Sequence, residues 1–381
     1  MGLNAYVGAR VLFYFRLALT PPGLALYWSL CFILAFSYFI GMALSGGGLG
    51  KAFQSIGGYW MVTFFYLLFG FIFMDALRFL GRRPIIAPLR NALPTYSLTL
   101  AGTLAVCGAL GAVAYGAWHA RQITVAEYSI ETVKPGPPGE LTIALISDLH
   151  IGSSVNAAWL GRVVDRINGM EPDIVCIAGD IFDNNLNSIS DTEQYVSLLR
   201  RIKAPFGAYA CLGNHDVDRI SFRQGGDGED GLMAKGISQI LEDSHIVLLR
   251  DEMVFVDGRF YVAGRRDARP IGADRQPRLS AAEVARGRDE RFPLILLDHQ
   301  PSDITGGVAA GADLILSGHT HKGQVFPARL ATRRIFAIDY GYMREGTTHI
   351  VVSSGAGVWG PPVRIGSNSE VAVIHFKWYN N

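Results

Sequence analysis

The sequence predicts an α-helical membrane region followed by an α/β domain, and two patterns carry this prediction. Long apolar segments almost free of charge fill much of the first third of the 381 residues. After residue 140, short apolar runs alternate with segments whose apolar residues recur at helical spacing. Strands that alternate with helices in this way are typical of α/β folds.

Composition argues against two kinds of site. The net charge of +1 lacks the basic excess that is typical of nucleic-acid-binding proteins, so no nucleic-acid partner is expected. The four cysteines, at positions 31, 107, 176 and 211, all fall in apolar segments. They are therefore expected to be buried small side chains, and neither a disulfide framework nor a thiolate metal site is predicted.

Three apolar segments in the membrane region, residues 1–120, are long enough to cross about 30 Å of hydrocarbon. These predicted transmembrane helices are residues 22–44, 58–80 and 96–118. Residues 2–19 are shorter and contain Arg10 and Arg16, which favours an interfacial helix and leaves a fourth span as the alternative. Residues 121–139 are predicted to be a linker, in which the run KPGPPG forms a stiff connector to a domain of residues 140–381.

Basic residues predict the orientation of these spans. Arg10 and Arg16 precede the first span, and only Lys51 lies between the first and the second. A basic cluster at the end of the second span comprises Arg78, Arg82, Arg83 and Arg90. Because cytoplasmic loops are rich in Lys and Arg, a multi-pass membrane protein is expected, with the domain of residues 140–381 outside the cytoplasm.

Five short apolar strands of the second region end in turns rich in Gly, Asp, Asn and His. The five stretches are residues 141–146, 173–178, 208–212, 293–297 and 313–316. Residues 157–169 and 191–203 are predicted to be amphipathic helices between them. Five of the nine histidines fall in these turns, and ligands collect at the carboxyl ends of strands in such folds.

The residue types in these turns suit a pair of divalent cations. Asp148 and His150 are two residues apart, so in an extended chain their side chains point to the same side. Two cations about 3.5–4 Å apart need a bridging carboxylate, and neutral imidazoles suit most other positions. A hydroxide held between such ions would attack phosphorus in line, and the leaving oxygen would then need a proton donor.

The motifs SDLHIG, GDIFD, GNHD, DHQP and GHTHKGQ occur in this order and resemble the calcineurin-like metallophosphoesterase superfamily. The resemblance covers about residues 141–374 and extends to the membrane-associated bacterial phosphodiesterase branch. It implies a four-layer αββα sandwich with a dinuclear site at one edge. The expected cofactors are two divalent ions of Mn, Fe or Zn.

The resemblance also implies two sets of metal ligands that share Asp180. The first metal would be bound by this shared carboxylate together with Asp148, His150 and His321. The second metal would be bound by the same carboxylate together with Asn214, His299 and His319.

Other roles follow from the same resemblance. His215 matches the catalytic histidine, which donates a proton to the leaving group or steadies the phosphate charge. Asp216 would orient that imidazole, and Asp183 is expected to support the metal ligands without binding the ions. Lys322, where the branch often has Gly, either contacts a substrate phosphate or is solvated. Arg364 either clamps a phosphate or is a surface residue.

Two charged loops complete the domain. Residues 224–231, QGGDGEDG, form either a lid or a solvated connection. Residues 265–291 contain eight arginines and either meet lipid headgroups or an anionic substrate, or form a solvated, partly mobile loop, which is the favoured interpretation.

The expected function is that of a membrane-anchored phosphoesterase that hydrolyses a phosphodiester or phosphoanhydride. Its expected partners are membrane lipids and a phosphate-ester substrate, with lipid-linked substrates among the candidates. One alternative is the pyrophosphatase that cleaves UDP-2,3-diacylglucosamine, although that reaction is cytosolic and the basic loops indicate the opposite side. Another is a membrane scaffold or channel with a metal-stabilised, non-catalytic domain, in which Asp75 is the one acidic residue within a span.

Overall fold

The structure, a computed structural model, consists of two compact units, each described here by itself. It describes residues 2–44, 48–80, 97–152, 155–183, 191–217, 232–267 and 278–379. The first unit contains residues 1–119 and 360–363, and the second contains residues 120–359 and 364–381.

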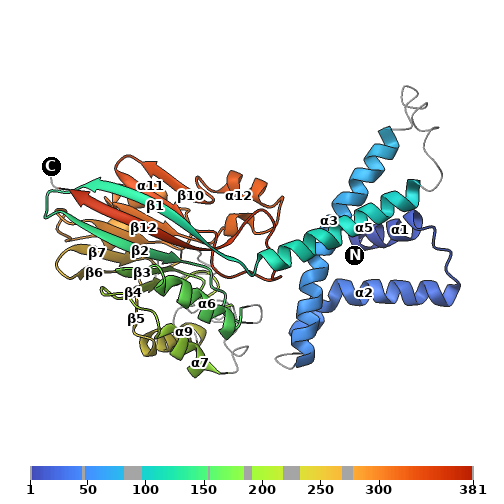
Figure 1. Cartoon of the computed structure of the whole chain (residues 1–381), viewed down its shortest axis with the longest axis horizontal. Coiled ribbons are helices and arrows are strands. Elements are labelled where there is room, and N and C mark those ends of the chain that lie inside the picture. The colour runs from blue at the N-terminus through green and yellow to red at the C-terminus, as the bar shows by residue number, and fades with distance from the viewer. Residues whose placement is uncertain are drawn as a thin grey trace. The chain divides into compact units, whose positions relative to one another are not determined.

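The first unit is helical. Its described helices are α1 (Gly2–Tyr14), α2 (Pro21–Ala43), α3 (Gly48–Leu80) and α5 (Ser97–His119) (Figure 1). Three segments are long and apolar enough to cross a membrane, namely Pro21–Ala43, Gly48–Leu80 and Leu98–His119. The 13 residues of α1 extend for only about 20 Å, too short to span a bilayer. Of the basic cluster used for orientation, Arg82, Arg83 and Arg90 lie outside the described residues.

The second unit contains two six-stranded mixed sheets. The first has the order β1-β12-β2-β3-β4-β5 and the second the order β10-β11-β9-β8-β7-β6. The strands of the first sheet are β1 (Ile123–Val133), β2 (Gly139–Ile146), β3 (Ile174–Ala178), β4 (Ala208–Cys211), β5 (Ile246–Leu248) and β12 (Ser369–Tyr379). The strands of the second are β6 (Glu252–Val256), β7 (Phe260–Gly264), β8 (Leu294–Leu297), β9 (Leu314–Ser317), β10 (Gly341–Glu345) and β11 (Thr348–Val352).

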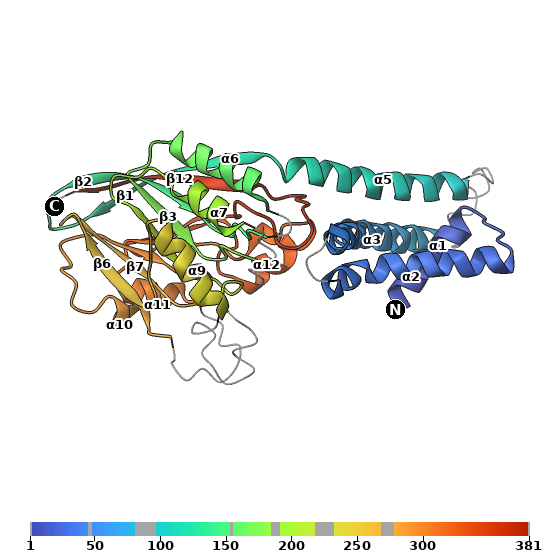
Figure 2. The ribbon, with the colours of Figure 1, turned by 90° about the horizontal axis from the view of Figure 1, so that it is seen from below.

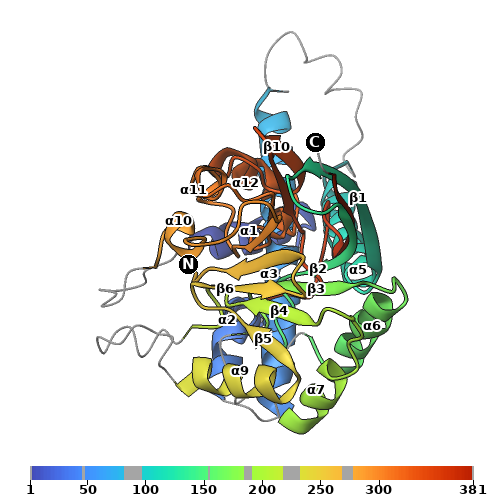
Figure 3. The ribbon, with the colours of Figure 1, turned by 90° about the vertical axis from the view of Figure 1, so that its left-hand side faces the viewer.

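Helices cover the outer face of each sheet, and apolar side chains fill the space between the sheets. Helices α6 (Ala157–Asn168), α7 (Thr192–Leu199) and α9 (Leu232–Asp243) pack on the first sheet (Figure 3). Helices α10 (Ala281–Val284) and α11 (Ile304–Ala309) pack on the second, and α12 (Arg329–Ile335) follows the short 3-10 helix His321–Gly323. Residues of both sheets, such as Ile143 and Leu316, form the core between them. The four-layer αββα sandwich is confirmed.

The predicted linker, residues 121–139, is wrong over most of its length. Strand β1 (Ile123–Val133) occupies it and pairs in parallel with β12 (Figures 1 and 2). The KPGPPG run joins β1 to β2 within the domain, and Lys134 at its start forms a 2.9 Å ion pair with Asp313. This strand was missed because its alternating sequence, ITVAEYSIETV, is too polar to stand out beside the apolar strands.

Candidate metal centre

Six of the predicted metal ligands lie in two groups at the ends of strands. Within each group, one ligand atom of every residue lies within 4.8 Å of the others. The first group is Asp148, His150 and His321, and the second is Asp180, His299 and His319. They follow β2, β3, β8 and β9, so both sheets contribute to one site. The groups reproduce the two predicted ligand sets in part, because Asp180 is absent from the first group and Asn214 from the second. A third group, His150, Asp183 and His215, overlaps the first.

Asp180 belongs to the second group and also faces a histidine of the first group. Its Oδ2 atom is 3.2 Å from Nε2 of His299 in the second group and 3.7 Å from Nε2 of His150 in the first. Nε2 of His150 is in turn 3.1 Å from Nε2 of His321. The carboxylate of Asp180 is therefore in the position that a bridging ligand requires.

Two buried atoms without hydrogen-bond partners show that these residues suit metal ions as ligands. Asn214 Oδ1 and His299 Nε2 are buried and have no hydrogen-bond partner within the described part of the chain. His299 Nδ1 lies 2.8 Å from the carbonyl oxygen of Ala178, a contact that orients the ring so that Nε2 faces the site. A buried polar atom without a partner costs about 1–3 kcal/mol, and a cation at this place would satisfy both atoms.

Burial and neighbouring charges shift the pKa values of this cluster. Burial raises the pKa of Asp148 to about 6 and lowers that of His150 to about 3. Burial also opposes the ionisation of Asp180, but the neighbouring His299 holds the pKa of this carboxyl well below its ordinary value. Asp180 is therefore a carboxylate and His150 a neutral imidazole, the forms that bind metal.

Backbone conformation at the ligands is unusual. Five ligands have positive φ angles, a region that residues other than glycine rarely adopt: Asp148, His150, Asp180, His319 and His321. Gly179 also has a positive φ of 76°, as a sharp bend requires. Gly318 instead provides space, because a Cβ atom there would lie 2.3 Å from Oδ2 of Asp148. Gly179 therefore permits the bend of the chain, whereas Gly318 is needed for close packing.

His215 lies beside the first group, with its ring centroid 4.9 Å from that of His150. Its Nδ1 atom is 3.7 Å from Oδ1 of Asp183, so this carboxylate faces the imidazole. The two oxygens of Asp216 instead accept backbone N–H groups of Ile181, Phe182 and Gly213. The orienting role predicted for Asp216 is therefore corrected: this carboxylate holds two site loops together, and Asp183 is placed to orient the imidazole.

Arg364 is fully buried, so its interpretation as a surface residue is wrong. Its Nη2 atom donates to the carbonyl groups of Ser354, Gly355 and Gly357, and Nη1 donates to the hydroxyl of Ser367. The predicted role of Arg364 as a phosphate clamp is also wrong, because Nη1 and Nη2 already have partners within the protein. Arg364 fixes the loop that passes the metal ligands.

Lys322 is half-buried, so the solvated alternative for this side chain is wrong as well. Its Nζ atom lies 4.0 Å from the centre of the Tyr340 ring, a cation–π contact. Tyr340 donates a 2.7 Å hydrogen bond to the buried carboxylate of Glu370. The side chain of Lys322 is thus packed into the domain, and its predicted contact with a substrate phosphate stays a prediction.

Trp359 is a site residue that the sequence analysis missed. Its side chain is 54% exposed, and its ring centroid lies 6.1 Å from that of His215. The side-chain amide of Gln324 donates to the carbonyl of Trp359 and accepts from its N–H, each at 2.9 Å. The only sequence signal was its position in the Gly-rich run near the carboxyl terminus.

Two arginines of the arginine-rich loop are packed into the domain, whereas Arg286 and Arg291 are exposed. Arg265 is buried and donates to carboxylates of Asp298 and Asp303, at 3.0 and 2.8 Å. Arg278 also pairs with Asp298. The prediction of a solvated loop is wrong for these ends, while residues 268–277 and the acidic loop 224–231 lie outside the described residues.

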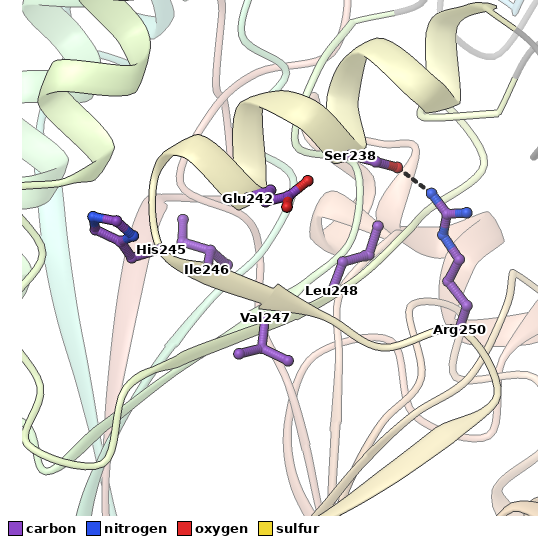
Figure 4. A pocket seen from close by; sticks show the side chains of 7 residues that line it. All are labelled: Ser238, Glu242, His245, Ile246, Val247, Leu248 and Arg250. Carbon is purple, nitrogen blue, oxygen red and sulfur yellow. Dashed lines mark hydrogen bonds between the residues drawn. The ribbon is translucent and has the colours of Figure 1, made fainter.

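A further cavity of about 560 Å³ lies between α9 and the edge strand β5 (Figure 4). It is lined by Ser238, Glu242, His245, Ile246, Val247, Leu248 and Arg250, and Arg250 donates a hydrogen bond to Ser238 at one side. This cavity shares no residue with the metal ligands.

Comparison with known proteins agrees with this geometry. The family model for calcineurin-like phosphoesterase matches residues 141–323. An uncharacterized metallophosphoesterase of Helicobacter pylori is 31% identical over 244 residues, which cover 62% of this chain and 59% of that relative. The match therefore spans less than two thirds of the relative's own length.

Two other similarities differ in strength. A transmembrane protein with metallophosphoesterase domain of Danio rerio is 28% identical over 343 residues, covering 86% of this chain and 73% of that protein. Among solved structures, the NAD nucleotidase of Haemophilus influenzae matches 57% of this chain and 46% of its own at 15% identity, with a TM-score of 0.37. The ligand geometry and the family match lead to one assignment: residues 141–323 of this chain form a calcineurin-like metallophosphoesterase domain.

Proposed function

We propose that this protein is a membrane-anchored phosphodiesterase that depends on two divalent metal ions. The observation that carries the proposal is the carboxylate of Asp180 between two His/Asp groups, with His215 beside them. Two bound divalent ions would polarise a phosphoryl oxygen and activate water for attack on phosphorus. The helical unit supports membrane anchoring, and we place the catalytic domain outside the cytoplasm of a bacterial cell by the distribution of basic residues.

The chain's own residues then position the substrate and move a proton. His215 would donate a proton to the leaving oxygen, and Asp183 would hold the imidazole in the required orientation. The exposed ring of Trp359 would contact the group that leaves. These three side chains come from loops that follow different strands, so the fold alone brings them together.

A diester is favoured over a monoester by charge. A diester monoanion has one negative charge fewer than a monoester dianion, so it needs less positive charge from the protein. Arg364, one of the two cationic side chains predicted to meet a phosphate, is engaged with carbonyl groups instead. Phosphoanhydrides are the second candidate class of substrate, and UDP-2,3-diacylglucosamine is one example.

A substrate panel tests the proposal. The full-length protein in detergent with added Mn²⁺ is expected to hydrolyse bis-p-nitrophenyl phosphate faster than p-nitrophenyl phosphate or inorganic pyrophosphate. Chelation of the metal should abolish this activity, and adding back Mn²⁺ or Zn²⁺ should restore it. Faster hydrolysis of the monoester would contradict the diester assignment, and activity that survives metal removal would contradict the mechanism.

Replacement of Trp359 tests its role in substrate binding. Trp359→Ala is expected to raise KM for bis-p-nitrophenyl phosphate by about twofold to tenfold with little change in kcat, because an aromatic pair contributes about 0.5–1.5 kcal/mol. Trp359→Phe, the matched control, should retain most of the affinity. An equal KM for the alanine variant would show that the ring does not touch the substrate.

A further inference from the structure

The helical unit contains a cluster of charged side chains between α1 and α3. Nε of Arg10 lies 2.6 Å from Oδ2 of Asp75, an ion pair between the two helices. The hydroxyl groups of Tyr6 and Tyr14 donate to the same carboxylate, at 2.7 and 3.2 Å. Both carboxylate oxygens of Asp75 therefore have polar partners on α1. These contacts between α1 and α3 are explained neither by a role of Asp75 in ion conduction nor by simple exposure of Asp75 to lipid headgroups.

Arg78 brings a second positive charge to this place. Its guanidinium carbon lies 4.5 Å from the ring centre of Phe13 and 5.8 Å from that of Tyr14. Within the described part of the chain, Arg78 forms no ion pair with a carboxylate. The cluster thus holds two guanidinium groups and one carboxylate, which leaves one positive charge unbalanced. An unbalanced charge near a bilayer core is costly, and an anion would offset it.

An open space exists for such an anion. A cavity of about 260 Å³ is lined by Arg10, Phe13, Asp75, Arg78 and Phe79. This volume lies just below the range of about 300–1,000 Å³ that is typical of sites for drug-sized ligands, so it suits a headgroup better than a larger molecule. Its wall contains cationic groups and aromatic rings. The cationic groups suit a negatively charged headgroup, and the rings suit the apolar chain attached to it.

The position of the cavity along α3 corresponds to the headgroup layer. No charged residue lies between Lys51 and Asp75, and this uncharged stretch extends for about 35 Å of helix. It is enough to cross the hydrocarbon core of about 30 Å, so Asp75 and Arg78 come at the level where phosphates begin. Basic pockets between membrane helices at this level bind anionic lipid headgroups.

We propose that the cavity between α1 and α3 binds the phosphate of an anionic phospholipid such as phosphatidylglycerol. Arg78 would donate N–H groups to the phosphate oxygens, and the single negative charge of the lipid would balance the cluster. The bound lipid would also fasten α1 to α3, in addition to the Arg10–Asp75 pair. This site is separate from the metal ligands and does not depend on the proposed hydrolysis.

Lipid titration of the delipidated, full-length protein in detergent tests the proposal by calorimetry. Short-chain dihexanoyl phosphatidylglycerol is expected to bind more tightly than dihexanoyl phosphatidylcholine. Both lipids carry a phosphodiester, so binding at the metal centre would not distinguish them. Arg78→Gln should weaken phosphatidylglycerol binding by about fivefold or more, and bis-p-nitrophenyl phosphate hydrolysis should be unchanged.

Three comparisons decide the result. Lys51→Gln, which removes one positive charge from the other end of α3, should leave lipid binding unchanged. An equal loss in this control would overturn the proposal in favour of general charge attraction. Arg78→Lys, which keeps the charge without the planar guanidinium, should bind with intermediate affinity and replaces the glutamine variant if that one does not fold. If glycerol 3-phosphate displaced the lipid and bound with the same affinity, the natural ligand of the cavity would be a soluble phosphate compound instead of a lipid.

Discussion

Asp180→Asn is expected to remove both metal ions and almost all activity. The carboxylate lies within 3.7 Å of imidazoles from both ligand groups, so one change removes the negative charge that the two sites share. Loss of a residue that merely supports a metal ligand costs about 10–100-fold in affinity or activity. Loss of the shared ligand should therefore lower kcat/KM for bis-p-nitrophenyl phosphate by more than 100-fold. Metal content per chain, measured by mass spectrometry after dialysis, should fall from two to near zero.

Asp313→Asn is the matched control, because it also removes a buried carboxylate charge. Asp313 pairs with Lys134 at 2.9 Å and accepts the N–H of Leu294, away from the metal ligands. This variant should unfold at a lower temperature and still retain two ions and normal turnover. If Asp180→Asn retained one tightly bound ion, Asp180 would belong to a single site and the bridge would be disproved.

Much of the metal centre could be predicted from local sequence. Each ligand stands just after a short apolar strand, and such strands are recognisable because their side chains are buried on both faces. The carboxyl ends of these strands meet in space, so turns that are far apart in sequence could be assigned to one site. Local sequence placed Asp148, His150 and Asp180 in such turns, whereas their assignment as ligands came from the family resemblance.

Roles that depend on packing could not be predicted in the same way. Arg364 and Lys322 follow polar or glycine-rich runs, which gave no sign that the first is buried against carbonyl groups and the second against Tyr340. The choice between Asp183 and Asp216 as partner of His215 depends on where two loops lie relative to each other. Strand β1 (Ile123–Val133) was missed because its polar residues, not an apolar run, fill its exposed positions.

His215→Ala is expected to lower kcat for a diester with an alkoxide leaving group by about 100- to 10,000-fold, the usual contribution of a general acid. His215 forms a possible metal group with His150 and Asp183 but belongs to neither predicted ligand set, so we expect metal content to remain at two ions per chain. His375→Ala is the control, because that imidazole is exposed on β12 and pairs only with Glu127 among the contacts described. Its turnover and metal content should be those of the unchanged protein.

The leaving group separates the two roles that His215 can have. p-Nitrophenolate departs without a proton, whereas an alkoxide needs one, so a proton donor matters more for an alkyl diester. The loss caused by His215→Ala should therefore be much larger for a dialkyl phosphate than for bis-p-nitrophenyl phosphate. Equal losses would show that the imidazole stabilises charge on the phosphate instead. Asp183→Asn should give a smaller loss with the same preference, since this carboxylate acts only through the imidazole.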